Sequence, residues 1–108
     1  MNDASAIAKL NDAFRANLSL GTFVLTAGIL TDMPQDVEAI LNKVRTFKGF
    51  NESGDPYGEH DFGAFDFKGK KIFWKIDYYD RNFEFASPDA ADTSVTNRVL
   101  TIMYADEY

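Results

Sequence analysis

The chain has 108 residues, a formal net charge of −6 and no cysteine. This length suits one domain with a single hydrophobic core, and a content of 45% hydrophobic and 15% aromatic residues excludes a disordered chain. The lack of cysteine excludes disulfides, thiol nucleophiles and thiolate metal sites. The acidic charge argues against a surface that binds nucleic acid directly, and it suits attraction to a basic partner.

The N-terminal segment predicts an amphipathic helix over residues 2–17. Its apolar side chains lie three or four residues apart and form one stripe, namely Ile7, Leu10, Phe14 and Leu18. We do not expect this polar segment to be a signal peptide, and every apolar run falls far short of the roughly 20 residues that span a membrane. The run TFVLTA predicts a short strand over residues 22–27.

A second helix is predicted over residues 34–48, after a connection over 28–33. Pro34 suits its first turn, and the cations Lys43 and Arg45 lie toward its C-terminal end, where they are favoured. Its expected buried stripe consists of Val37, Ile40, Leu41, Val44 and Phe47.

A β-hairpin is predicted over residues 61–79, which are rich in aromatic and β-branched side chains. The central pair of its turn is either Lys68-Gly69 or Gly69-Lys70, and the second pair fits a type II′ turn. Because both are two-residue loops, the same side chains share a face in either register. The expected core face carries Asp61, Gly63, Phe65, Phe67, Ile72, Trp74, Ile76 and Tyr78.

Two polar loops flank the hairpin, over residues 51–58 and 80–92. In the second loop we expect Phe83 and Phe85 to pin the backbone to the body of the protein. Residues 95–105 are apolar on both faces, which predicts a strand covered on both sides and central in the sheet.

The predicted order α-β-α-β-β-β favours an α+β fold in one domain, residues 1–108. The simplest arrangement is a single, antiparallel-dominated four-stranded sheet with two helices packed on one face. Whether the first strand pairs parallel or antiparallel stays open.

The run GEHDFG at the entry to the hairpin is the densest polar cluster, and it holds the only histidine, His60. The predicted pairing places His60 beside Asp77 and Tyr79, where it could transfer a proton or, with carboxylates, bind a metal. No nucleophile or metal spacing accompanies it, so we predict no catalytic residue, no metal and no cofactor. In a structural alternative, the acids cap turns and His60 bonds Asp77 or Tyr79. The residues expected to contact a partner are Asp55, Glu59, His60, Asp61, Asp77, Tyr79 and Asp80.

The second face of the hairpin carries Phe62, Phe73 and Tyr79 among charged residues. Exposed aromatic side chains anchor many protein interfaces, so this face is a candidate binding patch. In the alternative, residues 81–92 fold over these rings as a second layer.

Six motifs are the most specific features of the sequence from Leu10 onward: LNDAFR, FVLTAGI, DPYGEHDFGAFDF, IFWKIDYYD, SPDAAD and RVLTIMYADEY. With these motifs the chain resembles DUF3768, a bacterial family of unknown function. The resemblance implies a small protein, typical of alphaproteobacteria and common on mobile elements, and it implies no activity. The positions that match the family pattern in the hairpin are candidates only: Gly58, Glu59, His60, Asp61, Trp74, Asp77, Tyr78 and Tyr79.

By analogy with small acidic proteins of mobile elements, our first hypothesis is a non-enzymatic cytoplasmic protein that docks on a larger, basic host protein. Such a protein would inhibit a nucleic-acid-targeting defence system, as an anti-CRISPR or anti-restriction factor does. The alternative is a small metal- or His-dependent hydrolase centred on His60. A homodimer that pairs exposed edge strands is the third hypothesis.

Overall fold

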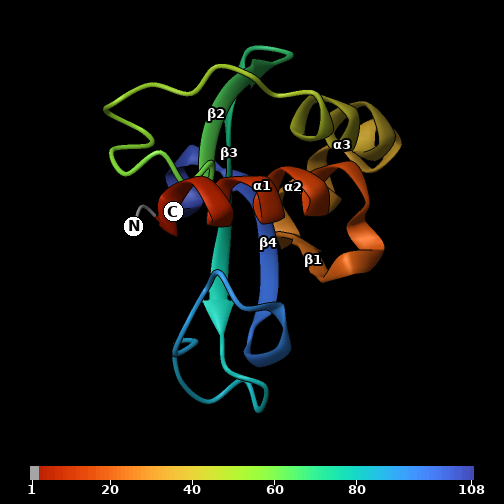
Figure 1. Ribbon diagram of the computed structural model, residues 1–108. Helices are drawn as coiled ribbons and strands as arrows, with labels where there is room; N and C mark the ends of the chain where they lie inside the picture. The colour runs from red at the N-terminus through yellow and green to blue at the C-terminus, as the bar shows by residue number, and fades with distance from the viewer. Residues whose placement is uncertain (1–2) are drawn as a thin grey trace.

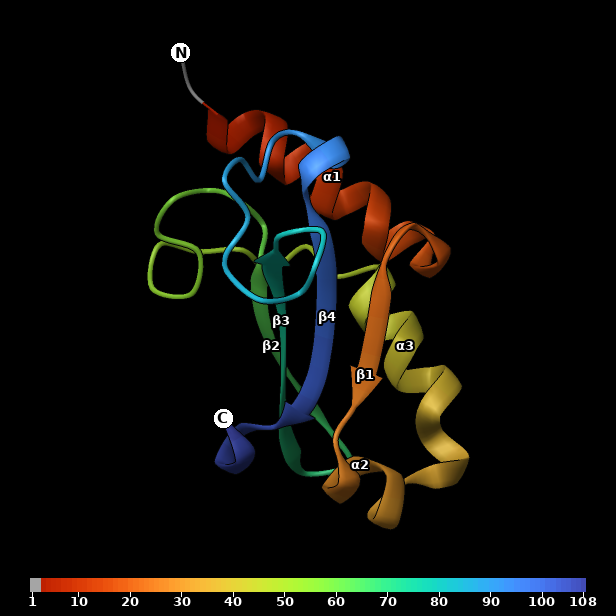
Figure 2. The same cartoon turned by 90° about the horizontal axis from the view of Figure 1, so that it is seen from below.

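The computed structural model describes residues 3–108 and shows a four-stranded sheet with helices on one face (Figures 1 and 2). The helices are α1 (Asp3–Ala16), α2 (Ala27–Asp32) and α3 (Val37–Arg45). The strands are β1 (Thr22–Leu25), β2 (Phe62–Phe67), β3 (Lys70–Tyr79) and β4 (Asn97–Tyr104). The predicted α+β fold is confirmed. The predicted first helix included Asn2, which lies outside the described residues.

The strand order is β1-β4-β3-β2, so β4 lies inside the sheet as predicted. β1 pairs with β4 in parallel, which answers the question that the sequence left open. The pairs β2–β3 and β3–β4 are antiparallel, so the sheet is mixed but mostly antiparallel.

The hydrophobic core lies between the helices and one face of the sheet. Alternate residues of β3, namely Ile72, Trp74 and Ile76, are at most 3% exposed, as the period of a strand requires. Their counterparts on β4 are Leu100 and Ile102. The helices contribute to this cluster with Phe14, Ile29, Ile40, Leu41 and Val44.

The hairpin turns at Lys68-Gly69, with Phe67 opposite Lys70. Both central residues have positive φ, at 50° and 79°, which is typical of a type I′ turn; of the two central pairs that the sequence allows, the structure has the first. In this register Gly63 lies opposite Trp74. A Cβ atom on Gly63 would lie 2.3 Å from the indole Nε1, so only glycine leaves room for this ring.

Residues expected to form a connection instead form α2, which carries the fully buried Ile29 into the core. The predicted second helix begins with a 3₁₀ turn, Pro34–Asp36, and its α-helical part ends at Arg45. On β4, Leu100 and Ile102 are buried on one face. On the other face Met103 is buried, whereas Val99 and Thr101 are partly exposed, so the expected cover on both faces is only partial.

We call the sheet face without α1, α2 and α3 the open face. It carries alternate residues of β3, namely Phe73, Lys75, Asp77 and Tyr79, and their neighbours Phe62, Thr101 and Met103. The ring of Tyr108 lies 6.1 Å from that of Phe62 and 5.8 Å from that of Phe73. Of the three aromatic rings on this face, Phe62 and Phe73 are therefore partly covered by Tyr108, whereas Tyr79 is contacted by Phe83 of residues 81–92.

Candidate functional site

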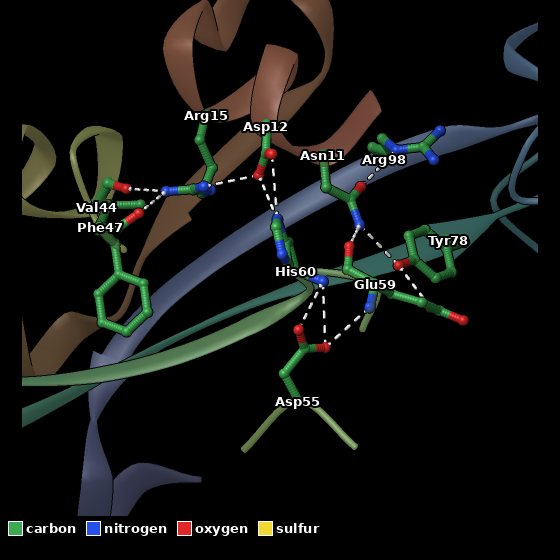
Figure 3. A network of polar contacts seen from close by, with 10 residues as sticks. All are labelled: Asn11, Asp12, Arg15, Val44, Phe47, Asp55, Glu59, His60, Tyr78 and Arg98. Atoms are coloured by element: carbon green, nitrogen blue, oxygen red, sulfur yellow. Dashed lines mark hydrogen bonds and ion pairs between the residues drawn. The ribbon is translucent and has the colours of Figure 1, made fainter. Parts of the chain in front are cut away.

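Helix α1 turns three polar side chains, Asn11, Asp12 and Arg15, toward the start of the hairpin (Figure 3). Asn11 is fully buried and Arg15 is 5% exposed. Burial of polar groups costs free energy unless hydrogen bonds satisfy them, so their partners define the local structure.

Asn11 connects three parts of the fold. Its amide donates to the carbonyl of Glu59 at 3.0 Å and to the hydroxyl of Tyr78 at 2.9 Å. Its carbonyl accepts from Nε of Arg98 on β4 at 2.8 Å. The Tyr78 hydroxyl in turn donates to the Glu59 carboxylate at 3.0 Å, and burial raises the pKa of Tyr78 far above its usual range. This tyrosine is therefore a neutral hydrogen-bonding group near neutral pH.

His60 faces Asp12, with its Nδ1 at 2.9 Å and 3.1 Å from the two carboxylate oxygens (Figure 3). Its ring stacks on Phe50, with centroids 4.0 Å apart and planes 5° from parallel. The expected neighbours, Asp77 and Tyr79, are not its partners. Gly58 and His60 both have positive φ, so the backbone here is not extended as in a strand. The side chain of His60 therefore does not follow the alternation of the hairpin, and it points toward α1.

Arg15 joins this site to the end of α3. Its Nη1 donates to the carbonyls of Val44 at 2.7 Å and Phe47 at 3.2 Å, which satisfies acceptors that a helix end leaves free. Its Nη2 donates to Asp12 at 2.8 Å. The guanidinium also lies over the ring of Phe50, while its Nε has no hydrogen-bond partner.

Asp55, predicted to contact a partner, is only 8% exposed. Its carboxylate accepts the backbone N–H groups of Glu59 and His60, so it shapes the loop. Asp61 is half-buried; this burial, followed by the nearby charge of Glu59, raises the pKa of its carboxyl group. Asp55 and Asp77 add to this effect, so Asp61 lies within a concentration of negative charge.

The other predicted residues lie away from the hairpin entry: Asp77 and Tyr79 are on the open face, and Asp80 directly follows β3. Asp77 is 2.9 Å from the ammonium of Lys75. Tyr79 ends β3, and its ring is 6.2 Å from that of Phe83. Asp80 accepts the backbone N–H groups of Asn82 and Glu84. The structure therefore divides the predicted set between the hairpin entry and the end of β3.

The sequence interpretation missed four residues of the polar network, although all lie in the quoted motifs: Asn11, Asp12, Arg15 and Arg98. The available signal was the pair Asn11 and Arg15, polar residues one helical turn apart on a side that also carries apolar residues. Nothing in the sequence indicates that this pair faces the hairpin.

Within residues 3–108, no group of three or more His, Cys, Asp or Glu side chains is placed to hold a metal ion. In the same range, the longest helices are too short and too polar to cross a membrane.

A family model described as "Protein of unknown function (DUF3768)" matches residues 25–107. The chain belongs to the DUF3768 family. The match contains the hairpin, the loop 80–92 and β4, whereas α1 with Asn11, Asp12 and Arg15 lies before it. No curated protein and no solved structure matches the chain.

Proposed function

We propose that this DUF3768 protein is a non-enzymatic binding protein that docks on a basic surface of a larger protein through residues 80–92, here called the aromatic loop. The main observation in support is the exposure of two phenylalanines: Phe83 is 54% exposed and Phe85 is 72% exposed. Phe85 does not pin the loop to the body as expected, and Phe83 does so only in part, through its ring contact with Tyr79. Large aromatic side chains that gain little from the fold are typical anchors of protein interfaces.

The aromatic loop projects beyond the end of β3, at the bottom of Figure 1. Its turn is closed by hydrogen bonds from the Asp80 amide to the Phe85 carbonyl at 2.8 Å and from the Phe83 amide to the Asp80 carbonyl at 3.1 Å. The side chain of Asn97 also donates to the carbonyls of Asp80 and Arg81. A loop fixed in this way loses little conformational freedom on binding, which favours affinity.

The charge of this region supports a basic partner. The aromatic loop contains four carboxylates, Asp80, Glu84, Asp89 and Asp92, and its one cation, Arg81, donates to Asn97. Two further carboxylates lie outside the loop: Asp61 at the hairpin entry, and Asp77 on the open face, where it pairs with Lys75. The raised pKa of Asp61 indicates that its negative charge is unfavourable in the free protein, so a cation from a partner would relieve it.

The proposal is tested by capture from a lysate of the organism that encodes the chain. Wild-type protein, Phe83→Ser/Phe85→Ser and a control, Leu20→Ser/Leu30→Ser, are compared as baits. The control removes two side chains that are 60% and 49% exposed but lie outside the aromatic loop. We expect a basic protein to be retained by the wild type and the control, and lost with the double phenylalanine variant.

With the purified partner, the affinity should fall as salt rises from about 50 to about 500 mM, because salt screens exposed charges. Each phenylalanine should contribute about 2 kcal/mol, or roughly 30-fold in affinity, if it is an anchor. Equal binding by the phenylalanine variant, or an affinity that is independent of salt, would contradict the proposal.

A finer part of the proposal is that the partner belongs to a defence system that targets nucleic acid. Proteins of this kind carry basic grooves for phosphates, and a carboxylate-rich surface with aromatic anchors could occupy one. The corresponding context is a mobile element and a cytoplasmic location. Binding assays with purified CRISPR and restriction effectors test whether the partner belongs to such a system. If the protein binds none of them, the defence-system role is refuted, and the proposal of a basic partner is unaffected.

A hydrolase centred on His60 remains a second candidate, because Asp12 orients the ring as the third group of a catalytic triad does. If His60 acts as a base, His60→Gln should abolish turnover of a substrate with little change in the melting temperature. A lowered melting temperature with no activity in the wild type would make the Asp12–His60 pair structural.

A further inference from the structure

An open hollow of about 500 Å³ lies between α1, the end of α3 and the hairpin entry, on the other side of the hairpin from Asp77. We call it the α1–α3 groove. It adjoins the polar network of Figure 3, and three side chains of that network line it: Asp12, Arg15 and His60. The remaining lining residues come from the end of α3 and the segment after it: Arg45, Thr46, Phe47, Lys48 and Phe50.

The groove is positively charged in a protein whose net charge is −6. Its lining has three permanent cations, Arg15, Arg45 and Lys48, against one carboxylate, Asp12. Of these cations, Arg15 pairs with Asp12. Among residues 3–108, neither Arg45 nor Lys48 forms an ion pair, although unpaired carboxylates are plentiful elsewhere on the surface. The two free cations therefore give the groove its charge.

The polar groups of the groove differ in what they offer a ligand. The Nε of Arg15 lacks a partner, but it is enclosed by the protein, so it does not reach a ligand in the groove. His60 uses Nδ1 on Asp12, so in the neutral ring the proton lies on Nδ1 and Nε2 is left as an acceptor. The backbone of His60 has a φ of 58°, an uncommon conformation for a residue other than glycine and one that is found often at binding sites.

We propose that the α1–α3 groove binds the phosphate group of a small molecule. Arg45 and Lys48 supply charge from the α3 side, and the ring of His60 faces them from the hairpin entry with Nε2 available to a hydroxyl of the ligand. Phosphate near neutral pH carries more negative charge than a carboxylate, so it gains more from two unpaired cations. Phe47 and Phe50 form the apolar wall of the groove.

The test uses the chain's only histidine as a reporter. Its imidazole nitrogens are followed by long-range ¹⁵N NMR while inorganic phosphate, glucose 6-phosphate or acetate is added at constant pH and ionic strength. We expect saturable shifts of the Nε2 signal with both phosphates and a much weaker response with acetate. A stronger response to glucose 6-phosphate than to inorganic phosphate would identify a phosphorylated small molecule as the ligand class.

Arg45→Glu/Lys48→Glu should weaken phosphate binding roughly tenfold or more, because it replaces two attractive charges with two repulsive ones. The control Lys9→Glu/Lys43→Glu changes the net charge equally at exposed cations outside the groove, and it should bind as the wild type does. If charge reversal unfolds the protein, Arg45→Ala/Lys48→Ala takes its place. No saturable shift with phosphate, or equal weakening by the control pair, would overturn the proposal. Neither result depends on the aromatic loop.

Discussion

Replacement of Asn11 by alanine is expected to destabilise the protein more than replacement of any other asparagine by alanine. The amide of Asn11 contacts three residues of the network: Glu59, Tyr78 and Arg98. Without it, Nε of Arg98 and the carbonyl of Glu59 lose their partners in a buried setting. The Tyr78 hydroxyl keeps its bond to the Glu59 carboxylate.

The magnitude follows from these two orphaned groups. A buried group left without a hydrogen bond costs about 1–3 kcal/mol, and more where the group is charged, as the guanidinium is. Burial already lowers the pKa of Arg98, which shows that the charged form is short of compensation. We therefore expect a loss of about 2–4 kcal/mol in the free energy of unfolding, which is a large share of the stability of a small domain.

The assay is urea denaturation followed by the fluorescence of the only tryptophan, with Asn42→Ala as the matched control. Asn42 lies on α3 with an exposed side chain, so its replacement gains the same helix propensity without a loss of buried contacts. The control should stay within about 0.5 kcal/mol of the wild type. If Asn11→Ala and Asn42→Ala unfold within about 1 kcal/mol of each other, the network does not link α1 to the sheet.

Two further substitutions test local parts of the structure. Gly63→Ala should cost about 1–3 kcal/mol by overpacking against Trp74 and should change the tryptophan emission; unchanged stability would mean that the glycine is not needed there. For Asp61, the raised pKa means that the folded state binds a proton more tightly than the unfolded state, so its contribution to stability falls as pH rises from its ordinary value through the raised one. Asp61→Asn should therefore stabilise the protein slightly at pH 7, by up to about 0.5 kcal/mol, and lose this advantage in acid; a lower stability at pH 7 would refute the burial argument.

The fold was predictable wherever hydrophobic periodicity sets the structure. The alternation around Trp74 predicts the core face of β3, and this prediction holds for either turn, although the observed turn lies one residue before the alternative Gly69-Lys70. The short helix α2 was not predictable, because six residues do not form a helix by propensity alone. It forms because the fully buried Ile29 packs in the hydrophobic core, which is a tertiary effect.

The candidate sites were only partly predictable, for two reasons. The position of His60 depends on two residues with positive φ, Gly58 and His60, and strand periodicity does not apply to such a segment. The exposure of Phe83 and Phe85 depends on how the aromatic loop turns at Asp80, which composition does not determine. The polar residues of α1 could not be predicted as part of the site, because the sequence does not show which face of this helix meets the hairpin.

The aromatic loop as the contact surface is tested most directly by amide hydrogen exchange in the free protein and in its complex with the captured partner. We predict that binding slows exchange in residues 80–92, most strongly around Phe83 and Phe85, and leaves β1 and α2 unchanged. Protection confined to β1 and α2, with exchange in the aromatic loop as fast as in the free protein, would contradict the account.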